Sequence, residues 1–342
     1  MAALVTIDAR DAAVTQLRGW GRYAACLIEA LRALNPDGLQ FDLLTHAPRG
    51  PEVVFEQVLL PLHLRRRRSA LVHATNCFLP LARSCPGVVT IHDLAFEAWP
   101  EDFRPRTRAK YRALTRLAAR SAQRIIVPSD FTAEDLDRRY GVDPGKLRVI
   151  PEAPALPLGG LPAPPGPYVL AVGDLRRKKN LDTLVRAFAR LHRRQRSGHR
   201  LVLAGVDTGQ GATLRDLAGD APLELTGYVS DARLDALIRG AEVVVHPSRY
   251  EGFGLVVLEA MARGTPVIAA AGTALAQTAG DAGVLFDAEA HDAQAQLEAL
   301  LDHVLADDSA RAELSRRGLE HARGFSWKRA AMATSETYVE LL

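Results

Sequence analysis

The chain has 342 residues, 48% of them hydrophobic, which is more apolar sequence than one domain core usually holds, so two domains are expected. It contains no run of eighteen apolar residues that would cross a membrane. Its start, MAALVTIDAR, is typical of a buried strand rather than a signal peptide, so we expect a cytoplasmic protein. Three cysteines, Cys26, Cys77 and Cys85, have neither CxxC nor zinc-ligand spacing, so no disulfide framework or structural metal is expected.

The net charge of +3 is distributed unevenly along the chain. Residues 1–150 carry 22 Lys and Arg against 16 Asp and Glu, a net charge of +6, which leaves −3 for residues 151–342. The first half is therefore the better candidate for an anionic partner.

Short apolar runs alternate with helical patterns along the whole chain. Such runs are typical of strands that are buried on both faces, and helices between them imply right-handed crossovers. The sequence therefore predicts two doubly wound, Rossmann-like α/β domains. The predicted strands include residues 3–7, 41–45, 70–74, 88–93 and 124–129 in the first half, and 168–173, 200–205, 223–229, 243–248 and 266–270 in the second.

A segment rich in proline and glycine, PEAPALPLGGLPAPPGP, covers residues 151–167 between two strand-like runs. This composition cannot continue a helix or a central strand, so it is interpreted as the linker between domains. We expect an N-terminal domain over residues 1–155, a C-terminal domain over 156–325, and a final helix over 326–342 that returns to the N-terminal domain.

Open α/β sheets bind ligands beyond the carboxyl ends of their strands. The polar residues that directly follow the predicted strands are therefore the first candidates for a site. They are His73, His92 with Asp93, Ser129, Gly173 with Asp174, Gly205, and the stretch that follows His246. If the two domains face each other, these residues would line one cleft.

The stretch RYEGFGLVVLEAMARGTPVIAA, residues 249–270, combines two acids with two glycines ahead of a strand. A helix is expected over residues 255–263, ended by Gly264 and Pro266. Gly252 and Gly254 would let the backbone approach a phosphate-sized anion at the start of that helix. The two acids, Glu251 and Glu259, suit hydroxyl groups on either side of a diphosphate, because an ionised carboxylate accepts two hydrogen bonds. A glutamate on a helix is more often simply solvated.

This stretch resembles the E-x7-E signature of the retaining glycosyltransferases of family four, which have the GT-B fold of two Rossmann-like domains facing an interdomain cleft. Further landmarks that look like those of this family follow in order along the chain. They are GRYAACLIEAL at 21, TIHDLAF at 90, RIIVPSDFTAEDL at 124, VGDLRRKKNLDTLVRAF at 172, LTGYVSDARLDALIRGA at 225 and FSWKRAA at 325.

The resemblance implies a donor site in the C-terminal domain. Glu251 would accept hydrogen bonds from the donor sugar, and Glu259 from the nucleotide ribose. The backbone amides of Phe253, Gly254 and Leu255 would face the diphosphate. The loop that begins at Gly173 would supply cations, with Lys179 at the family's lysine position. Many members have arginine where this chain has Asp174, so Arg176, Arg177 or Lys178 would substitute.

In the N-terminal domain the resemblance implies the acceptor side. Gly19 and Gly21 would form the family's glycine-rich loop, in which Trp20 is unusual and either stacks on an acceptor or packs. His92 matches the active-site histidine that binds the transferred sugar. Asp93 beside it has no third ligand that would complete a metal site. His73 and Asn76 are weaker candidates for the acceptor side.

Two arginine-rich runs remain in the basic half. Arg65 to Arg68 are consecutive, and six arginines from Arg104 to Arg124 recur at intervals of four, which on a helix forms one ridge. Each run is either a solvated face or a contact with anionic lipid at the inner face of a membrane. Nucleic acid is not expected as a partner, because no recognition module is present and aromatic residues are only 6%.

The function implied by the resemblance is a retaining, metal-independent transfer of a hexose from a nucleotide-diphosphate sugar, with a leaning to GDP-mannose, to an acceptor hydroxyl. The acceptor would be lipid-linked or a polysaccharide precursor, and no cofactor is expected. His92, Glu251 and Lys179 would carry the reaction. A nucleotide-sugar epimerase of the same fold and a non-catalytic sugar-nucleotide-binding partner are the alternatives. An NAD-dependent dehydrogenase is disfavoured, because neither domain opens with GxGxxG.

Overall fold

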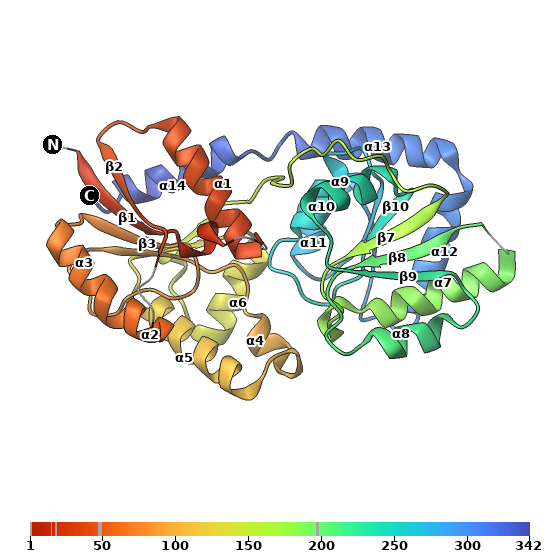
Figure 1. Cartoon of the computed structure of the whole chain (residues 1–342), viewed down its shortest axis with the longest axis horizontal. Helices are drawn as coiled ribbons and strands as arrows, with labels where there is room; N and C mark the ends of the chain where they lie inside the picture. Colours follow the sequence, from red (N-terminus) through yellow and green to blue (C-terminus); the bar gives the residue numbers. More distant parts are fainter. Residues whose placement is uncertain (1, 15, 18, 47–49, 196–197) are drawn as a thin grey trace. The chain divides into compact units, whose positions relative to one another are not determined.

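The computed structural model describes residues 2–14, 16–17, 19–46, 50–195 and 198–342. The chain divides into two compact units, the first formed by Met1–Ala155 with Ser326–Leu342 and the second by Leu156–Phe325. Each unit contains a parallel six-stranded sheet with helices on both faces, as Figure 1 shows. This confirms the predicted α/β class. Among the described residues, no helix has the length and apolar character needed to cross a membrane.

The first sheet has the strand order β2-β1-β3-β4-β5-β6. All of its described neighbours pair in parallel. Because β2 lies on one side of β1 and β3 on the other, the chain order reverses between β1 and β3, where such sheets commonly bind ligands. The strands are β1 (Ala3–Asp8), β2 (Leu39–Leu44), β3 (Leu71–Ala74), β4 (Gly87–Thr90), β5 (Arg124–Val127) and β6 (Leu147–Val149).

The helices of the first unit cover both faces of this sheet. Helices α1 and α14 pack against each other, so the end of the chain belongs to the first unit. The helices are α1 (Gly19–Leu34), α2 (Glu52–Val54), the π-helical turn η2 (Phe55–Leu59), α3 (Leu60–Arg67), α4 (Ala95–Ala98), α5 (Pro105–Ser121), α6 (Asp130–Tyr140) and α14 (Trp327–Val339), with 3-10 turns at Arg10–Ala13, Pro100–Asp102 and Pro144–Lys146.

Neighbouring residues of the central strands pack on opposite faces of the first sheet. Leu71, Val88 and Ile126 belong to the core that includes residues of α1 and α14. Val72, Val89 and Ile125, each one position away, belong to the core that includes residues of α3 and α5. Because side chains alternate along a strand, a continuous apolar run is what a sheet covered on both faces requires.

The second sheet has the strand order β12-β11-β10-β7-β8-β9, the order of a Rossmann sheet. The chain order reverses between β7 and β10. The edge strand β12, which has three residues, was absent from the strands predicted above. The strands are β7 (Tyr168–Val172), β8 (Arg200–Ala204), β9 (Leu223–Gly227), β10 (Val243–His246), β11 (Val267–Ala270) and β12 (Val284–Phe286).

The helices of the second unit pack on this sheet around one continuous hydrophobic core. They are α7 (Leu181–Gln195), α8 (Gly211–Ala218), α9 (Asp231–Gly240), α10 (Leu255–Met261), α11 (Ala274–Ala279), α12 (Ala293–Ala306) and α13 (Asp308–Ala322), with 3-10 turns at Arg177–Lys179 and Gly280–Ala282. Helix α10 is shorter than the predicted helix over 255–263, because it closes at Ala262 and Gly264 adopts a positive φ of 72°.

The predicted arginine ridge over residues 104–124 is not a single helical face. Arg104 caps the start of α5, whereas Arg124 lies in β5 and pairs with Glu340. Between them, Arg112 pairs with Glu97 at 3.2 Å, and the guanidinium of Arg116 lies over the ring of Tyr140. Arg112, Arg116 and Arg124 therefore contact their own unit, so the six arginines do not form one uniformly solvated ridge.

The beginning of the second unit is fixed by a buried ion cluster. Asp235 on α9 is 0% exposed and accepts hydrogen bonds from Arg239 and Arg263, both at 2.8 Å, and from the amide of Gly159 at 3.0 Å. Arg239 and Arg263 also donate to carbonyls of residues 156–161. Burial opposes the charge of Asp235, but these hydrogen bonds outweigh it and lower its pKa.

We predict that Asp235→Ala lowers the free energy of unfolding by about 3–5 kcal/mol, because it leaves buried arginine charge without this partner. Since the pKa of folded Asp235 is lowered, the stabilisation is present at neutral pH and is lost as the pH falls through that pKa. Urea unfolding at neutral and acidic pH measures both effects. Asp216→Ala, at an exposed position on α8, is the control and should change stability by less than about 0.5 kcal/mol. Equal losses from both variants would contradict the structural role of Asp235.

Candidate active site

Two loops meet where the strand order of the second sheet reverses. The loop after β7 and the loop after β10 leave neighbouring strands at the same edge. The amide of Arg249 donates to the carbonyl of Lys178 at 2.9 Å, and the Asn180 side chain donates to the carbonyl of Pro247 at 3.1 Å. Open α/β sheets bind ligands at such a point, so the side chains of these two loops form the candidate site.

Glu251 is the centre of this site. Its carboxylate accepts a hydrogen bond from Lys179 Nζ at 2.5 Å and lies 3.8 Å from Lys178 Nζ. On its other side, His246 Nε2 lies 3.2 Å from the same carboxylate. Only 12% of the Glu251 side chain is exposed, so this group of charges is largely shielded from water.

The charges of the site fix its protonation. Burial would raise the pKa of Glu251, but the two lysines hold it well below its usual range, so the group is a carboxylate. Burial and the nearby charge of Lys179 lower the pKa of His246, which keeps its ring neutral at physiological pH. Because a carboxylate can only accept, the proton of neutral His246 is on Nε2.

Two glycines bring the backbone close to this group. Gly173 has a φ of 139°, and a side chain there would meet Lys179 Nζ at 3.2 Å. Gly254 precedes α10 with a φ of 96°, and a Cβ would lie 2.3 Å from Leu275 Cδ2. A larger residue would therefore have a strained backbone at both positions, and at Gly254 it would also clash with Leu275. The amides of Phe253, Gly254 and Leu255 follow Glu251 at the start of the helix.

The remaining cations of the first loop differ in exposure. Arg177 is exposed, whereas Arg176 is half-buried. Asp174, which replaces the family's arginine, accepts a hydrogen bond from the amide of Val206 at 3.2 Å and so holds the two loops of β7 and β8 together. Asp174 therefore stabilises the loop after β7.

Glu259 is buried, so the alternative considered for it, a solvated helix residue, does not hold. Its side chain accepts a hydrogen bond from the amide of Leu156 at 2.7 Å and from Arg263 Nη1 at 2.7 Å. Only 4% of Glu259 is exposed. The residue thus connects the start of the second unit with Arg263 and, through it, with Asp235.

In the first unit, polar groups gather where β1 and β3 end. Arg10 makes a bidentate pair with Asp8, at 2.8 and 2.7 Å, and reaches Glu56 at 3.2 Å. Asn76 donates to Asp11 at 2.7 Å and accepts from the amide of Phe78. This predicted acceptor-side residue therefore lies among charged groups at the reversal point of the first sheet.

His92 lies two residues beyond β4 and is 9% exposed. Its Nδ1 is 3.0 Å from the Glu152 carboxylate, and its Nε2 is 3.1 Å from the carbonyl oxygen of Thr75. These two contacts, one at each ring nitrogen, fix the orientation of the imidazole. The ring of Trp20 stacks on His92 with centroids 6.0 Å apart, and that of Tyr23 meets it edge-on at 4.6 Å.

The other first-unit candidates divide between this region and the core. Gly19 begins α1 with a positive φ, and Gly21 is buried where a Cβ would lie 2.5 Å from the carbonyl oxygen of Asp11. Trp20 between them is half-buried and packs against the core. His73, in contrast, is 0% exposed and bonds to Tyr338 of α14 and to Thr90. Burial lowers the pKa of His73 to about 3, so the structure assigns it to the core rather than to the acceptor side.

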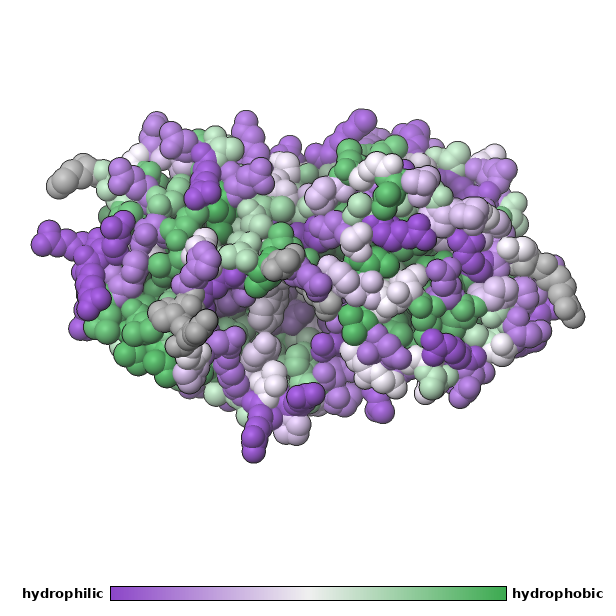
Figure 2. Space-filling model, viewed as in Figure 1, coloured by the Kyte–Doolittle hydropathy of each residue, from purple (hydrophilic) through white to green (hydrophobic). Residues whose placement is uncertain are grey.

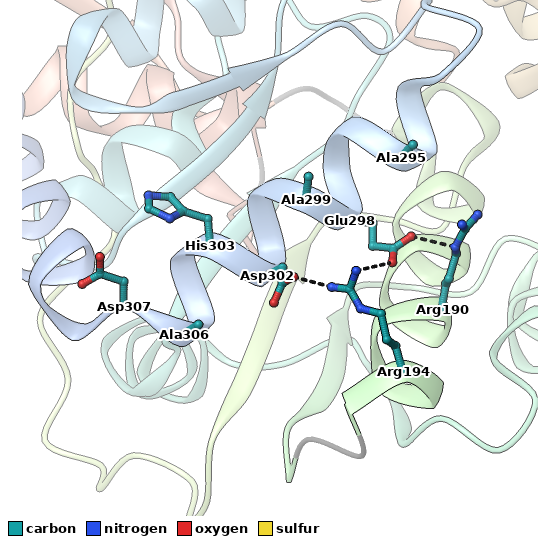
Figure 3. A pocket seen from close by; sticks show the side chains of 9 residues that line it. All are labelled: Arg190, Arg194, Ala295, Glu298, Ala299, Asp302, His303, Ala306 and Asp307. Atoms are coloured by element: carbon teal, nitrogen blue, oxygen red, sulfur yellow. Dashed lines mark hydrogen bonds and ion pairs between the residues drawn. The ribbon is translucent and has the colours of Figure 1, made fainter.

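A separate groove between α7 and α12 has no features of a catalytic site. Figure 3 shows that its charged side chains point toward one another, with Glu298 between Arg190 and Arg194, and Asp302 beside Arg194. The charges of these four side chains are thus paired within the groove. Among the residues that the structure describes, no group of three or more His, Cys, Asp and Glu side chains is placed to hold a metal ion.

Several residues of these sites were not predicted as site residues, among them His246, Glu152 and Arg263. His246 is the last residue of its strand, and the strand-end rule pointed to the residues after it. Glu152 lies three residues after the end of β6, inside the proline-rich segment, and that segment was interpreted only as a linker. Arg263 follows Glu259 by four residues, a spacing at which helical side chains meet and that could have revealed the pair.

Two family descriptions match most of the chain. Residues 161–321 match Glycosyl transferases group 1, and residues 18–153 match Glycosyltransferase Family 4. The O-antigen chain mannosyltransferase B of Escherichia coli is 32% identical over 293 residues, which cover 80% of this chain and 75% of that protein. A D-inositol 3-phosphate glycosyltransferase of Kineococcus radiotolerans is 34% identical over 64% of this chain, which spans 57% of that protein's length.

Solved structures share the whole fold. The sucrose-phosphate synthase of Thermosynechococcus elongatus has a TM-score of 0.72 and 25% identity, with 100% of this chain and 99% of that one covered. WaaG, a glycosyltransferase involved in lipopolysaccharide biosynthesis, has a TM-score of 0.72 at 17% identity, with 98% and 99% covered. Anabaena HepE in complex with UDP and glucose has a TM-score of 0.69 at 18% identity, with both chains fully covered. The GT-B fold is thereby confirmed.

We predict that Glu251→Gln strengthens the binding of inorganic pyrophosphate by about three- to tenfold, because it removes the negative charge that faces Lys178 and Lys179. Isothermal titration calorimetry at low salt measures this affinity. Glu289→Gln removes an exposed acid that pairs with Arg249 and is the control. Unchanged or weaker binding by the Glu251 variant, with the control equal to wild type, would show that the two lysines do not form the anion site.

Proposed function

The chain belongs to the group 1 glycosyltransferases, and from this premise we propose that it transfers a hexose from a nucleotide-diphosphate sugar to an acceptor hydroxyl, with retention of configuration and without a metal ion. The observation that supports this proposal most directly is the shielded group of Glu251, Lys178 and Lys179 at the reversal point of the second sheet. It combines cations for a diphosphate with a carboxylate for sugar hydroxyls.

In this proposal the second unit binds the donor. Lys178 and Lys179 contact the diphosphate, assisted by Arg176 and Arg177 and by the amides of Phe253, Gly254 and Leu255, which Gly173 and Gly254 allow to come close. When the phosphates take over the lysines, Glu251 is released to accept hydrogen bonds from the sugar. The exchange keeps the buried charges compensated, which matters because an unpaired buried charge costs several kcal/mol.

Glu259 is proposed to hold the nucleotide ribose. Its carboxylate accepts hydrogen bonds from Leu156 and Arg263. In this proposal the ribose hydroxyls donate to the same carboxylate while Arg263 keeps its orientation. Arg263 acts in this account as a positioning residue.

The first unit is proposed to bind the acceptor and the transferred sugar. His92 is held by Glu152 and Thr75, and its backbone or ring would contact the sugar. Gly19, Trp20, Gly21 and Asn76 would lie on the acceptor side. In the reaction, the bond between the anomeric carbon and the phosphate oxygen breaks, a bond to the acceptor oxygen forms on the same face, and the acceptor proton passes to the leaving phosphate.

This chemistry needs charge stabilisation and alignment rather than a protein nucleophile. The lysines compensate the charge that develops on the leaving diphosphate, a task that a metal ion performs in other transferases. The proposal therefore includes no cofactor.

The names of the relatives support an expectation of which donor sugar and which acceptor this chain uses. The E. coli relative is named as a mannosyltransferase that acts on an O-antigen chain, and HepE was solved with UDP and glucose. We infer a hexose donor, with GDP-mannose as the first candidate, and a saccharide acceptor that is lipid-linked or a polysaccharide precursor.

The test is transfer from GDP-mannose, UDP-glucose and dTDP-rhamnose to a panel of oligosaccharide acceptors, with and without EDTA. We expect a glycosylated product whose anomeric configuration, read by NMR, equals that of the donor, at a rate that EDTA does not change. An epimerised donor formed without acceptor would instead identify an epimerase. Binding without transfer or donor hydrolysis for any acceptor would identify a non-catalytic partner.

We predict that His92→Ala lowers transfer by about 10- to 1000-fold, or about 1.4–4 kcal/mol of transition-state stabilisation, as expected for one positioned polar group. Nucleotide affinity should stay within about twofold, because the proposed nucleotide contacts are all in the second unit. His303→Ala, in the groove between α7 and α12, is the control and should transfer at the wild-type rate. A folded His92 variant with wild-type transfer would remove His92 from the reaction.

A further inference from the structure

Four buried polar side chains connect the C-terminal helix α14 with α1 through the middle of the first sheet. The Tyr338 hydroxyl on α14 lies 2.6 Å from His73 Nδ1 on β3. His73 Nε2 lies 2.8 Å from Thr90 Oγ1 at the end of β4, and Thr90 Oγ1 lies 3.1 Å from the hydroxyl of Tyr23 on α1. These four side chains, called the buried network below, lie beneath the surface that Figure 2 shows, since each is at most 2% exposed.

The buried network is uncharged at neutral pH. Burial lowers the pKa of His73 to about 3, and burial raises the pKa of the Tyr23 and Tyr338 hydroxyls. A neutral imidazole donates through one ring nitrogen and accepts through the other, so His73 can bond to the hydroxyl groups on both of its sides. Because a buried polar group is costly to leave without a partner, these bonds hold the Tyr23 hydroxyl in place on the sheet.

The ring of Tyr23 extends from this hydroxyl to His92. The two rings meet edge-on with centroids 4.6 Å apart. The bonds from His92 to Glu152 and Thr75 hold its two ring nitrogens, and the ring of Tyr23 packs against the imidazole itself. The orientation of His92 therefore depends on where the ring of Tyr23 lies.

Helix α14 reaches the same place a second time, through its first residue. The ring of Trp327 meets the ring of Tyr23 with centroids 5.8 Å apart, and Trp327 Nε1 donates to the carbonyl of Pro154 at 3.0 Å. Pro154 is two residues beyond Glu152, the partner of His92. Figure 1 shows α14 alongside α1, with which it packs. The helix thus contacts both Tyr23 and the segment that carries Glu152.

We propose that Tyr23 is a positioning residue for the transfer reaction, which sets the orientation of the His92 imidazole, and that α14 holds Tyr23 through Trp327 and the buried network. This inference rests on the proposed role of His92. A group that takes part in a reaction needs neighbours that lock its side chain, because small displacements lower the rate strongly. In this account Tyr23 acts only through His92 and does not contact the substrate.

The first test observes His92 without donor or acceptor. Histidine is labelled with 15N, and the ring nitrogen signals of His92, one of ten histidines, are identified by their absence from the NMR spectrum of His92→Ala. Tyr23→Leu, which removes the ring, should shift these signals most. Tyr23→Phe keeps the ring and Trp327→Phe loses the bond to Pro154, and both should cause smaller shifts. Because this result needs no transfer, failure of this inference and failure of the proposed function are distinguishable.

The second test measures transfer. Tyr23→Leu should lower kcat at least about tenfold, and Tyr23→Phe about two- to fivefold, because the phenylalanine ring still packs against His92. Nucleotide affinity should stay within about twofold, since the proposed nucleotide contacts are in the second unit. The double variant Tyr23→Leu with His92→Ala should transfer as slowly as His92→Ala alone, because a residue that acts through His92 has no effect once His92 is absent.

Matched controls separate positioning from stability. Tyr168 is also 0% exposed, and its hydroxyl donates to the carbonyl of Leu237 at 2.7 Å in the second unit. Tyr168→Phe should lower the thermal unfolding midpoint much as Tyr23→Phe does, yet leave the His92 signals and kcat at their wild-type values. Met332→Ala, which changes a side chain of α14 that is 42% exposed, should match wild type in every measurement.

Three results would overturn the proposal. They are unchanged His92 signals in the folded Tyr23 variants, wild-type kcat in those variants, and losses that add together in the double variant. Circular dichroism establishes whether each variant is folded. Where Tyr23→Leu does not fold, Tyr23→Phe and Trp327→Phe decide the outcome, by the same two measurements.

Discussion

The structure of the candidate site depends on the ion pair between Glu251 and its two lysines. Lys178 and Lys179 lie on one loop and Glu251 on another, and the pair holds the loops together at the edge where the second sheet reverses. Without a ligand the carboxylate compensates both cations. In the proposed reaction an anionic ligand would take the place of the carboxylate at the lysines, and the carboxylate would then accept hydrogen bonds from hydroxyl groups. The proposal thus gives this one interaction a role both without and with the ligand.

A second ion cluster connects α10, the helix that follows Glu251, to neighbouring segments of the second unit. Glu259 and Arg263 lie on and directly after α10, and Arg263 reaches Asp235 on α9. Glu259 and Asp235 also bind amides of Leu156 and Gly159, so the first residues of the unit are fixed to both helices. The segment that carries Glu251 therefore leads into a helix whose position is set by buried charges as well as by apolar packing.

The strands and the fold could be predicted because a sheet covered on both faces requires unbroken apolar runs, and ten such runs were identified. Of the two remaining strands, β6 corresponds to the strand-like run before the proline-rich segment, and β12 was not predicted. The environments of individual side chains could not be predicted in this way, because they depend on residues that are far away in the sequence. His73 follows the strand-end rule, yet it faces Tyr338, which is 265 residues away. Glu259 is a helix residue like many solvated ones, yet it is buried and accepts a hydrogen bond from Leu156, which is 103 residues away. The four-residue arginine period continues to Arg124, although the helix ends at Ser121.

The central claim is that Lys178 and Lys179 exchange Glu251 for a diphosphate. A crystal structure of the chain with GDP or UDP tests it most directly. The account predicts lysine Nζ atoms within about 2.7–3.2 Å of phosphate oxygens, at the edge between β7 and β10, and a Glu251 carboxylate that has turned away from Lys179. A nucleotide bound elsewhere, with the Lys179–Glu251 pair intact, would contradict it.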